Sequence, residues 1–517
     1  MGRSMKQRRM CHGGVTAGSW RGPLAVALLV LGGAGGGNAE PVRPPNVIVV
    51  TLDACRADKF STFGFDRPTT PQLDALAADP DSVVFQNHHA QAAWTKPSTA
   101  SLFTGAYPSQ HQVEFEPGFS HDFTTLAEYF QAADYHTFAI ATNHHLNPKF
   151  GFAQGFDDYV FGPAQIAEKL GWREQAIASP LGKKLLWWGR HFAADWPWLW
   201  NFVPRWSLPR DSTKMAALQE MLPELETPYF GYTHFQGCHF PFTEEDRDPR
   251  YMERFPVEHD APGRHAAGVD FAAAQISHRV NRGEVALMPA DVDYLHLLYE
   301  AKTFLADDLV VGGLVRLLRE TGQYDDTLIV VTSDHGEALA DHSTFGHSSV
   351  FQEVLHIPLL VKFPKAQKPE ILPDEVIGIT RTIDLMPSLL SYLTLGPHGE
   401  LAGVDVFSGM TNDYTLAQSI LEQPATASPY WKSRSVRSRS FKLRESNDGV
   451  ELYDLRRDPG ESQDVSDRHA TELERLRAIL HPLRESEDTA LRSVEGGPEV
   501  AVDAETERWL RAMGYVE

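Results

Sequence analysis

The stretch TLIVVTSDHGE, residues 327–337, is a run of β-branched and apolar residues that ends in Ser-Asp-His-Gly. The stretch NVIVVTLDA, residues 46–54, has the same form and ends just after Asp53. Continuous apolar runs of this kind are typical of strands that are buried on both faces in parallel sheets. Ligands of open α/β sheets bind at the carboxyl ends of the strands. The two runs therefore predict strands that bring Asp53 and Asp334 to one shared site.

Other segments extend this pattern into an alternation of strands and helices. Such an alternation is the signature of a largely parallel sheet covered by helices, and so of the α/β class. Further strands are predicted at residues 135–142, 229–235 and 357–363, and helices at 71–78, 97–102, 124–133 and 294–321. Beyond Pro397, short alternating segments and a helix over 470–483 predict a smaller α+β domain, with a last helix over 503–514.

The composition is that of a globular protein with room for a large core. The chain has 517 residues, of which 42% are hydrophobic and 22% charged, which suits two to three domain-sized units or one large domain with an appendage. The net charge of −22 argues against a nucleic-acid-binding surface. A metal or a few cationic side chains can still bind a small anion. The three cysteines, Cys11, Cys55 and Cys238, leave at most one disulfide in the mature chain.

Residues 1–39 are predicted to form a cleavable secretory signal peptide. Basic residues between positions 6 and 21 precede the apolar run 24–31, and Gly37-Asn38-Ala39 supplies a small-x-Ala step. The apolar run is too short to cross a bilayer, although an uncleaved membrane anchor is the alternative. A working signal would start the mature chain near Glu40 in a periplasmic or extracellular space.

One segment is unusually rich in tryptophan. Seven of the eleven tryptophans fall within residues 172–206, interleaved with basic residues. Tryptophan favours half-wet apolar surfaces, so this insertion could contact a membrane surface or a carbohydrate. The alternative is a helical insertion whose aromatic side chains pack on the main sheet.

Residues 93–105, AWTKPSTASLFTG, place Thr95 directly before a Lys-Pro step. Proline is favoured in the first turn of a helix, so Thr95 is predicted at a helix N-terminus, whose N–H groups stabilise anions. With Asp53, Asp334 and His335, the Thr95 hydroxyl would form a mostly oxygen ligand set for a divalent cation. A hydroxyl bound to a metal is acidified and becomes a nucleophile.

A series of longer motifs runs in order along most of the mature chain. They are NVIVVTLDACRAD from residue 46, TTPQLDALA from 69, TKPSTASLFTGAYPSQH from 95, GFAQGFDDY from 151, GCHFPF from 237, DDTLIVVTSDHGEALADH from 325, FGHSSVFQEVLHIPLLV from 345 and ELYDLRRDPGESQDV from 451. In these motifs the chain resembles the sulfatase family of the alkaline-phosphatase-like superfamily. The resemblance implies a mixed, largely parallel sheet flanked by helices over residues 40–396, and a smaller C-terminal α+β domain over 397–517.

The resemblance also implies roles for individual residues. Asp53, Asp334 and His335 match metal ligands of the family, and Thr95 matches the nucleophile and a further ligand.

Three histidines match family positions around the transferred group. His239 matches a histidine that contacts this group or protonates the leaving oxygen. His347 matches a Lys or His that binds the non-bridging oxygens, and His145 fits the second half of a Lys-x-His step. His144 and His342 are expected to be structural or to lie next to the site.

The departures from the family pattern affect the chemistry. Most characterised sulfatases use a formylglycine made from Cys or Ser, and Thr95 cannot supply it because its methyl group blocks oxidation to the aldehyde. No formylglycine is therefore expected. The final Arg of the signature is Thr99, the Lys of the Lys-x-His step is Asn143, and the usual second Asp after the first strand is Ala54. His335 stands where an Asn is often found.

In its Thr nucleophile and its Asp-His metal pair, the chain resembles the phosphoryl-transferring branches of the superfamily, such as nucleotide pyrophosphatases and lipoteichoic acid synthases. A Thr alkoxide that attacks phosphorus would form a phospho-Thr ester, which water or an acceptor alcohol then resolves. A two-metal site would need an Asp at Phe235, so one divalent cation is expected. His335 shifts the preference from Ca²⁺ toward Mn²⁺, Zn²⁺ or Mg²⁺.

Three functions stay open on the sequence. The first is an exported metal-dependent hydrolase or transferase of sulfate, phosphate or phosphonate esters with Thr95 as nucleophile. The second is a sulfuric ester hydrolase that uses a metal-bound water, and the third is a non-catalytic binding protein with a sulfatase fold. Loss of the cations at positions 99 and 143 favours the third, whereas the retained candidate ligands and histidines oppose it. The expected substrate is a small or a glycan- or lipid-linked anionic ester.

Overall fold

The apolar run 46–52 forms strand β1 (Asn46–Leu52), which lies between β6 (Tyr229–Phe235) and β7 (Thr327–Ser333) in the computed structural model. Both pairings are parallel, and every residue of the three strands is buried, as their apolar sequences predict. The structure describes residues 43–113, 123–162, 165–166, 211–242, 246–255, 276–396, 401–422, 430–447 and 449–494. The described residues from Pro44 onward cluster into one compact unit.

Within the described residues, the largest sheet has eight strands in the order β12-β2-β11-β7-β1-β6-β4-β5. Neighbouring strands are parallel except where β11 pairs with β2 and with β7. This mixed, largely parallel sheet confirms the predicted α/β fold. The remaining strands are β12 (Glu375–Val376), β2 (Ser82–Phe85), β11 (Leu359–Lys362), β4 (His136–Ala141) and β5 (Asp158–Phe161).

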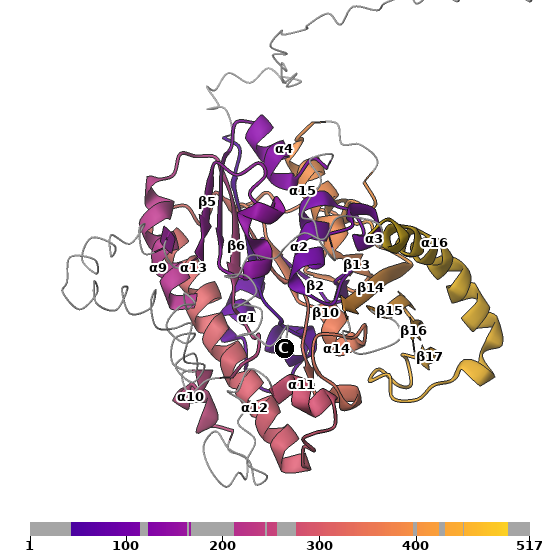
Figure 1. Ribbon diagram of the computed structural model, residues 1–517. Helices are drawn as coiled ribbons and strands as arrows, with labels where there is room; N and C mark the ends of the chain where they lie inside the picture. Colours follow the sequence, from indigo (N-terminus) through magenta and orange to yellow (C-terminus); the bar gives the residue numbers. More distant parts are fainter. Residues whose placement is uncertain are drawn as a thin grey trace, which may run out of the picture. The chain divides into compact units, whose positions relative to one another are not determined.

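Helices cover both faces of this sheet (Figure 1). Successive side chains of β1 point to opposite faces, so Ile48 packs in a cluster with Leu298, and Val49 packs in a cluster with Phe103. The first cluster contains residues of α1 (Pro71–Ala77), α9 (Asp211–Met221), α12 (Pro289–Ala306) and α13 (Gly312–Glu320). The second draws on α2 (Thr95–Thr104), α4 (Leu126–Ala132) and α15 (Leu385–Leu393).

Within the described residues the predicted helices are present, and one of them is interrupted. The segment predicted as a single helix over 294–321 consists of α12 and α13, which a π-helical turn over Asp307–Val311 joins. The shorter helices are α3 (Pro108–His111), α10 (Pro249–Met252), α11 (Ile276–Asn281) and α14 (Gln352–Leu355).

The C-terminal part forms the predicted α+β arrangement. An antiparallel sheet joins β14 (Tyr414–Glu422), β15 (Tyr430–Ser438), β16 (Phe441–Ser446) and β17 (Gly449–Asp454). Leu476 and Leu480 of α16 (Ala470–Val494) pack against its apolar face, which includes Val436 and Leu443. The helix α16 runs further than the predicted 470–483. We call residues 401–494 the C-terminal domain.

Two small sheets complete the described structure. One joins β10 (His356–Ile357), β3 (His88–His89) and β13 (Thr380–Arg381), and the other is a hairpin of β8 (Ala338–Leu339) and β9 (Phe345–Gly346). No helix of the described ranges combines the length and apolarity needed to span a bilayer. The predicted signal peptide (1–39), the Trp-rich insertion (172–206) and the last helix (503–514) lie outside the described residues.

Candidate metal and catalytic centre

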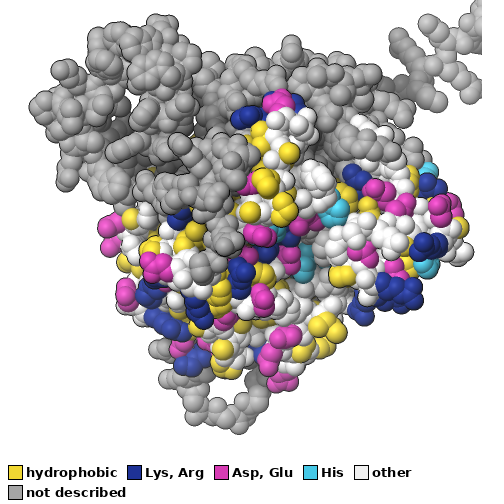
Figure 2. Space-filling model, turned by 90° about the horizontal axis from the view of Figure 1, so that it is seen from below, with side chains coloured by type: hydrophobic (Ala, Val, Ile, Leu, Met, Phe, Trp, Pro, Cys, Tyr) yellow, Lys and Arg dark blue, Asp and Glu magenta, His cyan; other side chains and the backbone are white. Residues whose placement is uncertain are grey.

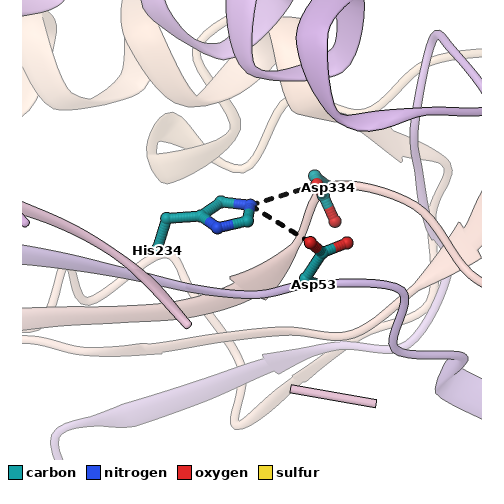
Figure 3. A group of neighbouring side chains, drawn as sticks. All are labelled: Asp53, His234 and Asp334. Carbon is teal, nitrogen blue, oxygen red and sulfur yellow. Dashed lines mark hydrogen bonds and ion pairs between the residues drawn. The ribbon is translucent and has the colours of Figure 1, made fainter. Parts of the chain in front are cut away.

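The carboxyl ends of β1, β6 and β7 bring two aspartates and a histidine together (Figure 3). Because β1 and β7 pair in register, Asp53 and Asp334 follow directly after paired residues. His234 pairs with Thr51 on the opposite side of β1. Asp53, His234 and Asp334 are buried, and each offers a ligand atom within 4.8 Å of the other two. The predicted meeting of Asp53 and Asp334 at one site is confirmed.

Hydrogen bonds fix which oxygen of Asp334 faces this group. Its Oδ1 accepts from the backbone N–H of Ala54 at 3.2 Å and of His335 at 2.9 Å. Its Oδ2 lies 3.2 Å from His234 Nε2, and the same nitrogen lies 4.0 Å from Asp53 Oδ2. The two carboxylates therefore each direct one oxygen toward His234, as the dashed lines in Figure 3 mark.

The two carboxyl groups are electrostatically unequal. Burial and the neighbouring Asp334 raise the pKa of Asp53 well above its ordinary value. Burial also opposes ionisation of Asp334, but its neighbour His335 and the hydrogen bond from His234 hold the pKa of Asp334 below its ordinary value. Two buried carboxylates this close repel each other, and a bound cation would relieve that repulsion.

His335 presents an unprotonated nitrogen to the same space. Its Nδ1 donates to the carbonyl oxygen of Gly336 at 2.8 Å, and burial lowers its pKa, so Nε2 carries a lone pair. That Nε2 lies 3.4 Å from Asp53 Oδ1 and 3.4 Å from Thr95 Oγ1. Asp53 Oδ1 is buried and accepts no hydrogen bond from the described residues. A lone pair and a carboxylate oxygen that face each other fit a cation between them.

Thr95 is the first residue of α2, as predicted, and it is buried. Asn143 donates from Nδ2 to both Thr95 Oγ1 at 3.2 Å and Asp53 Oδ2 at 3.0 Å. Ser98, one turn along α2, donates to the carbonyl oxygen of Asp334 at 2.5 Å and so ties the helix to the end of β7. The structure thus brings the whole predicted ligand set together, namely Asp53, Thr95, Asp334 and His335.

The three predicted histidines surround this set. The ring centroids of His335 and His347 are 4.4 Å apart, those of His239 and His347 5.2 Å, and those of His239 and His335 6.3 Å. His145 packs edge-on against Trp94 with 5.2 Å between the centroids. Burial lowers the pKa of His239 to about 3. Burial also lowers the pKa values of His145 and His347 well below their ordinary values, with Lys96 adding to the effect at His145 and the neighbouring histidines adding to it at His347. Histidine side chains lie near the middle of the face in Figure 2, beside acidic and basic groups.

The loop that carries His239 is held from several sides. Lys302 of α12 donates from Nζ to the carbonyl oxygens of His239 at 2.7 Å and Pro241 at 3.2 Å. The Phe240 N–H donates to Glu337 Oε2 at 3.3 Å. His239 Nδ1 donates to the carbonyl oxygen of Phe240, which fixes the tautomer of the neutral ring.

A disulfide between Cys55 and Cys238 joins the His239 loop to the strand end that carries Asp53. The Cys238 N–H donates to the carbonyl oxygen of Asp53 at 2.9 Å. Gly237 has a φ of +52°, and a Cβ there would lie 2.7 Å from the Asp53 nitrogen, so only glycine allows this approach. The sequence predicted at most one disulfide, and the described chain contains this one.

His234 was not among the residues predicted for the site, and Asn143 was considered only as the loss of a cation. The signal for His234 was its place at the carboxyl end of a buried strand, the same signal that identified Asp53 and Asp334. A cation does lie near His145: the ammonium of Lys96, whose Nζ also lies 4.3 Å from the centroid of the Phe150 ring. After burial, Lys96 is the largest influence that lowers the pKa of His145.

The chain shares this architecture with known ester hydrolases. It is 24% identical to N-acetylglucosamine-6-O-sulfatase of Bacteroides thetaiotaomicron over 498 residues, which cover 86% of each protein. It is 25% identical to the multifunctional alkaline phosphatase superfamily protein PehA of Trinickia caryophylli, over 67% of this chain and 73% of that protein. The crystal structure of phosphonate monoester hydrolase of Agrobacterium radiobacter shares the fold with a TM-score of 0.62 and 21% identity, over 86% of this chain and 96% of that one.

The Sulfatase family model matches residues 45–395, which include every residue of the site described above. This match covers more than half of the chain and agrees with the relatives. The chain belongs to the sulfatase family and is a sulfatase-family ester hydrolase.

Proposed function

We propose that this chain is an exported, metal-dependent hydrolase or transferase that uses Thr95 as its nucleophile on a sulfate, phosphate or phosphonate ester. The observation that carries the proposal is the position of the Thr95 hydroxyl. It is buried at the start of α2, accepts from Asn143 and lies 3.4 Å from an unprotonated His335 nitrogen.

The donor set fits one divalent cation. Asp53, Asp334, His335 and Thr95 would hold it, and His234 lies close enough to add a nitrogen. Bound there, a divalent cation would acidify the Thr95 hydroxyl and offset the negative charge of the ester.

Thr95 then performs the displacement. The acidified Thr95 hydroxyl gives its proton to solvent, and its Oγ1 forms a bond to phosphorus or sulfur while the bond to the leaving oxygen breaks, which gives a Thr95 ester. The N-terminal N–H groups of α2 favour the negative charge that develops there. In the second step, water or an acceptor alcohol attacks this ester and releases the Thr95 hydroxyl.

His239 is positioned to serve the leaving oxygen. Because its Nδ1 donates to Phe240, its Nε2 is free of a proton in the neutral ring. Burial keeps His239 neutral in the free protein, with a pKa of about 3. The negative charge of a bound ester would raise that pKa, so proton donation by His239 is coupled to substrate binding. His347 and His145 would contact the non-bridging oxygens.

Thr95 also favours phosphorus over the usual sulfatase route, because threonine cannot become formylglycine. A phosphate or phosphonate ester is therefore the first candidate substrate. Sulfate esters are the second, since N-acetylglucosamine-6-O-sulfatase is among the relatives and the two anions are similar in shape. The ester would be small or linked to a glycan or lipid.

Export is supported by the Cys55–Cys238 disulfide. Disulfides form and persist in oxidising compartments such as the periplasm and the extracellular space. The predicted signal peptide over residues 1–39 agrees with this compartment.

A paired assay tests the proposal. Purified protein is given Mn²⁺, Zn²⁺, Mg²⁺ or Ca²⁺ and matched aryl sulfate, phosphomonoester, phosphodiester and phosphonate substrates, with Thr95→Ala as control. We expect metal-dependent turnover that Thr95→Ala loses, and a phosphate adduct on the Thr95 peptide after rapid quenching. Equal turnover by both proteins would refute a covalent mechanism. Binding of an ester without turnover would favour the non-catalytic alternative.

A further inference from the structure

The hairpin of β8 and β9 connects two residues of the site. His335 lies three residues before β8, and His347 follows directly after β9. The tip of the hairpin contains three non-glycine residues with positive φ, namely Ala340 at 71°, His342 at 49° and Ser343 at 56°. Such backbone is costly and persists only where surrounding contacts determine it. The tip therefore needs support from outside the hairpin.

His342 supplies that support through both ring nitrogens. Its Nδ1 lies 2.9 Å from Glu353 Oε1, and its Nε2 lies 3.0 Å from the carbonyl oxygen of Glu461. A carbonyl oxygen and a carboxylate only accept, so both ring nitrogens donate and the ring is an imidazolium. The ring also stacks on Phe351 at 3.7 Å between centroids with an interplanar angle of 2°.

Glu461 belongs to the C-terminal domain and is itself firmly held. Its two carboxylate oxygens each accept from Lys442 Nζ at 2.8 Å, and Oε2 also accepts from the Gln352 N–H at 3.1 Å. Glu461 has a φ of 54°, so the contact joins two non-glycine residues with positive φ, His342 of the hairpin and Glu461 of the C-terminal domain. The backbone carbonyl oxygen of Glu461 accepts the hydrogen bond from His342, and the Glu461 side chain is bound to Lys442 of β16, so this acceptor is held in place.

We propose that His342 is a positioning residue that couples the C-terminal domain to the active site, because its bridge between Glu353 and Glu461 fixes the hairpin that places His347. We call these two hydrogen bonds the His342 bridge. This inference rests on the proposed function through the role of His347. Asn281 of α11 holds the middle of the hairpin, through Phe345 N at 2.8 Å and Phe345 O at 2.9 Å, so the bridge governs its tip.

The bridge is pH-dependent in a defined direction. Burial opposes the charge on His342, but Glu353 and Glu461 raise its pKa above the ordinary value of 6.5. The bridge is therefore complete at low pH and is lost as the pH rises through the raised pKa, because the neutral ring can donate from one nitrogen only. The other charged groups around it are Lys442, bound to Glu461; Arg444, over the Phe351 ring; and Asp341, bound to Arg56.

Hydrogen exchange and kinetics on the full-length protein test the bridge from pH 5.5 to 9. In the wild type we expect amide exchange in residues 338–347, corrected for its intrinsic pH dependence, to rise with pH, and kcat for an aryl phosphate to fall about 10-fold or more. His342→Gln should show the high-pH behaviour at every pH. His342→Arg keeps a planar cation on Phe351 and should keep the low-pH behaviour up to pH 9.

The control is His469→Gln, because His469 also packs on an aromatic ring of the C-terminal domain, with 5.1 Å to the Phe441 centroid. It should behave as the wild type. Wild-type exchange and pH profile in His342→Gln would overturn the proposal, as would a pH response in His342→Arg equal to that of the wild type. The exchange readout needs no turnover, so an inactive wild type would refute the proposed function and leave the bridge tested on its own.

Discussion

Replacing Asp53 with Asn should stabilise the metal-free protein and abolish its stabilisation by a divalent cation. Asp53 and Asp334 are buried and offer ligand oxygens within 4.8 Å of each other. Two unit charges at that separation repel by about 3.5 kcal/mol at an effective dielectric constant of about 20. Hydrogen bonds from Asn143 and His234 offset part of this repulsion. We therefore expect metal-free Asp53→Asn to gain about 1–3 kcal/mol in free energy of unfolding.

With metal, the order of stability should reverse. A cation at 1,000 times its Kd stabilises the wild type by about 4.1 kcal/mol, which exceeds the expected gain of the variant, whereas Asp53→Asn lacks the carboxylate whose Oδ1 faces His335 Nε2 at 3.4 Å. Denaturant unfolding followed by circular dichroism, with the protein treated with chelator and then supplied with Mn²⁺ or Zn²⁺, measures both changes at one pH.

Asp334→Asn is the matched control for this experiment. Asp334 Oδ1 accepts two backbone N–H groups, and a neutral amide oxygen accepts them more weakly. This variant should therefore lose stability with and without metal. The reasoning would be refuted if Asp53→Asn were less stable than the wild type without metal and still gained stability on metal addition.

Three further results are expected. Thr95→Ala should lose at least about 1,000-fold in kcat/KM while Thr95→Ser keeps part of the activity, because only the latter retains a nucleophile; steady-state assays on one aryl ester decide this. His239→Gln should lose about 100- to 10,000-fold on alkyl esters and much less on nitrophenyl esters, whose leaving oxygen needs no proton; equal losses on both would contradict its role as an acid. The double variant Cys55→Ala, Cys238→Ala should lose up to about 5 kcal/mol of stability, because the disulfide links positions 183 residues apart; unfolding midpoints measure it, and an unchanged midpoint would exclude this contribution.

The parts of the fold that follow from local pattern were predictable. The strands β1 and β7 are continuous apolar runs that end in aspartate, and both their burial and the meeting of Asp53 with Asp334 are confirmed. The π-helical turn over 307–311 was not predicted, because an uninterrupted helix was expected over 294–321.

The residues and contacts that the sequence did not predict depend on long-range topology. A strand such as β6, which is buried on both faces, has no polar face, so its sequence pattern does not show where His234 points. The expectation that His342 is structural was made without its partner, since Glu461 lies 119 residues later in the chain. The Cys55–Cys238 pairing likewise depends on how β1 and β6 end side by side. Contacts at such distances follow from the topology, which motif spacing alone does not supply.

Two departures from the family pattern, Ala54 and His335, change the candidate ligand set in the same direction. Ala54, where the second Asp is usual, has a φ of 58° and contributes only its N–H, which donates to Asp334. The end of β1 therefore supplies one carboxylate, Asp53, and His234 reaches the same place from β6. With His335, the candidate ligand set contains two nitrogens and fewer negative charges than an all-carboxylate set. Nitrogen ligands suit Mn²⁺ and Zn²⁺ better than Ca²⁺, so Ala54 and His234 together shift the expected metal in the direction that His335 already indicates.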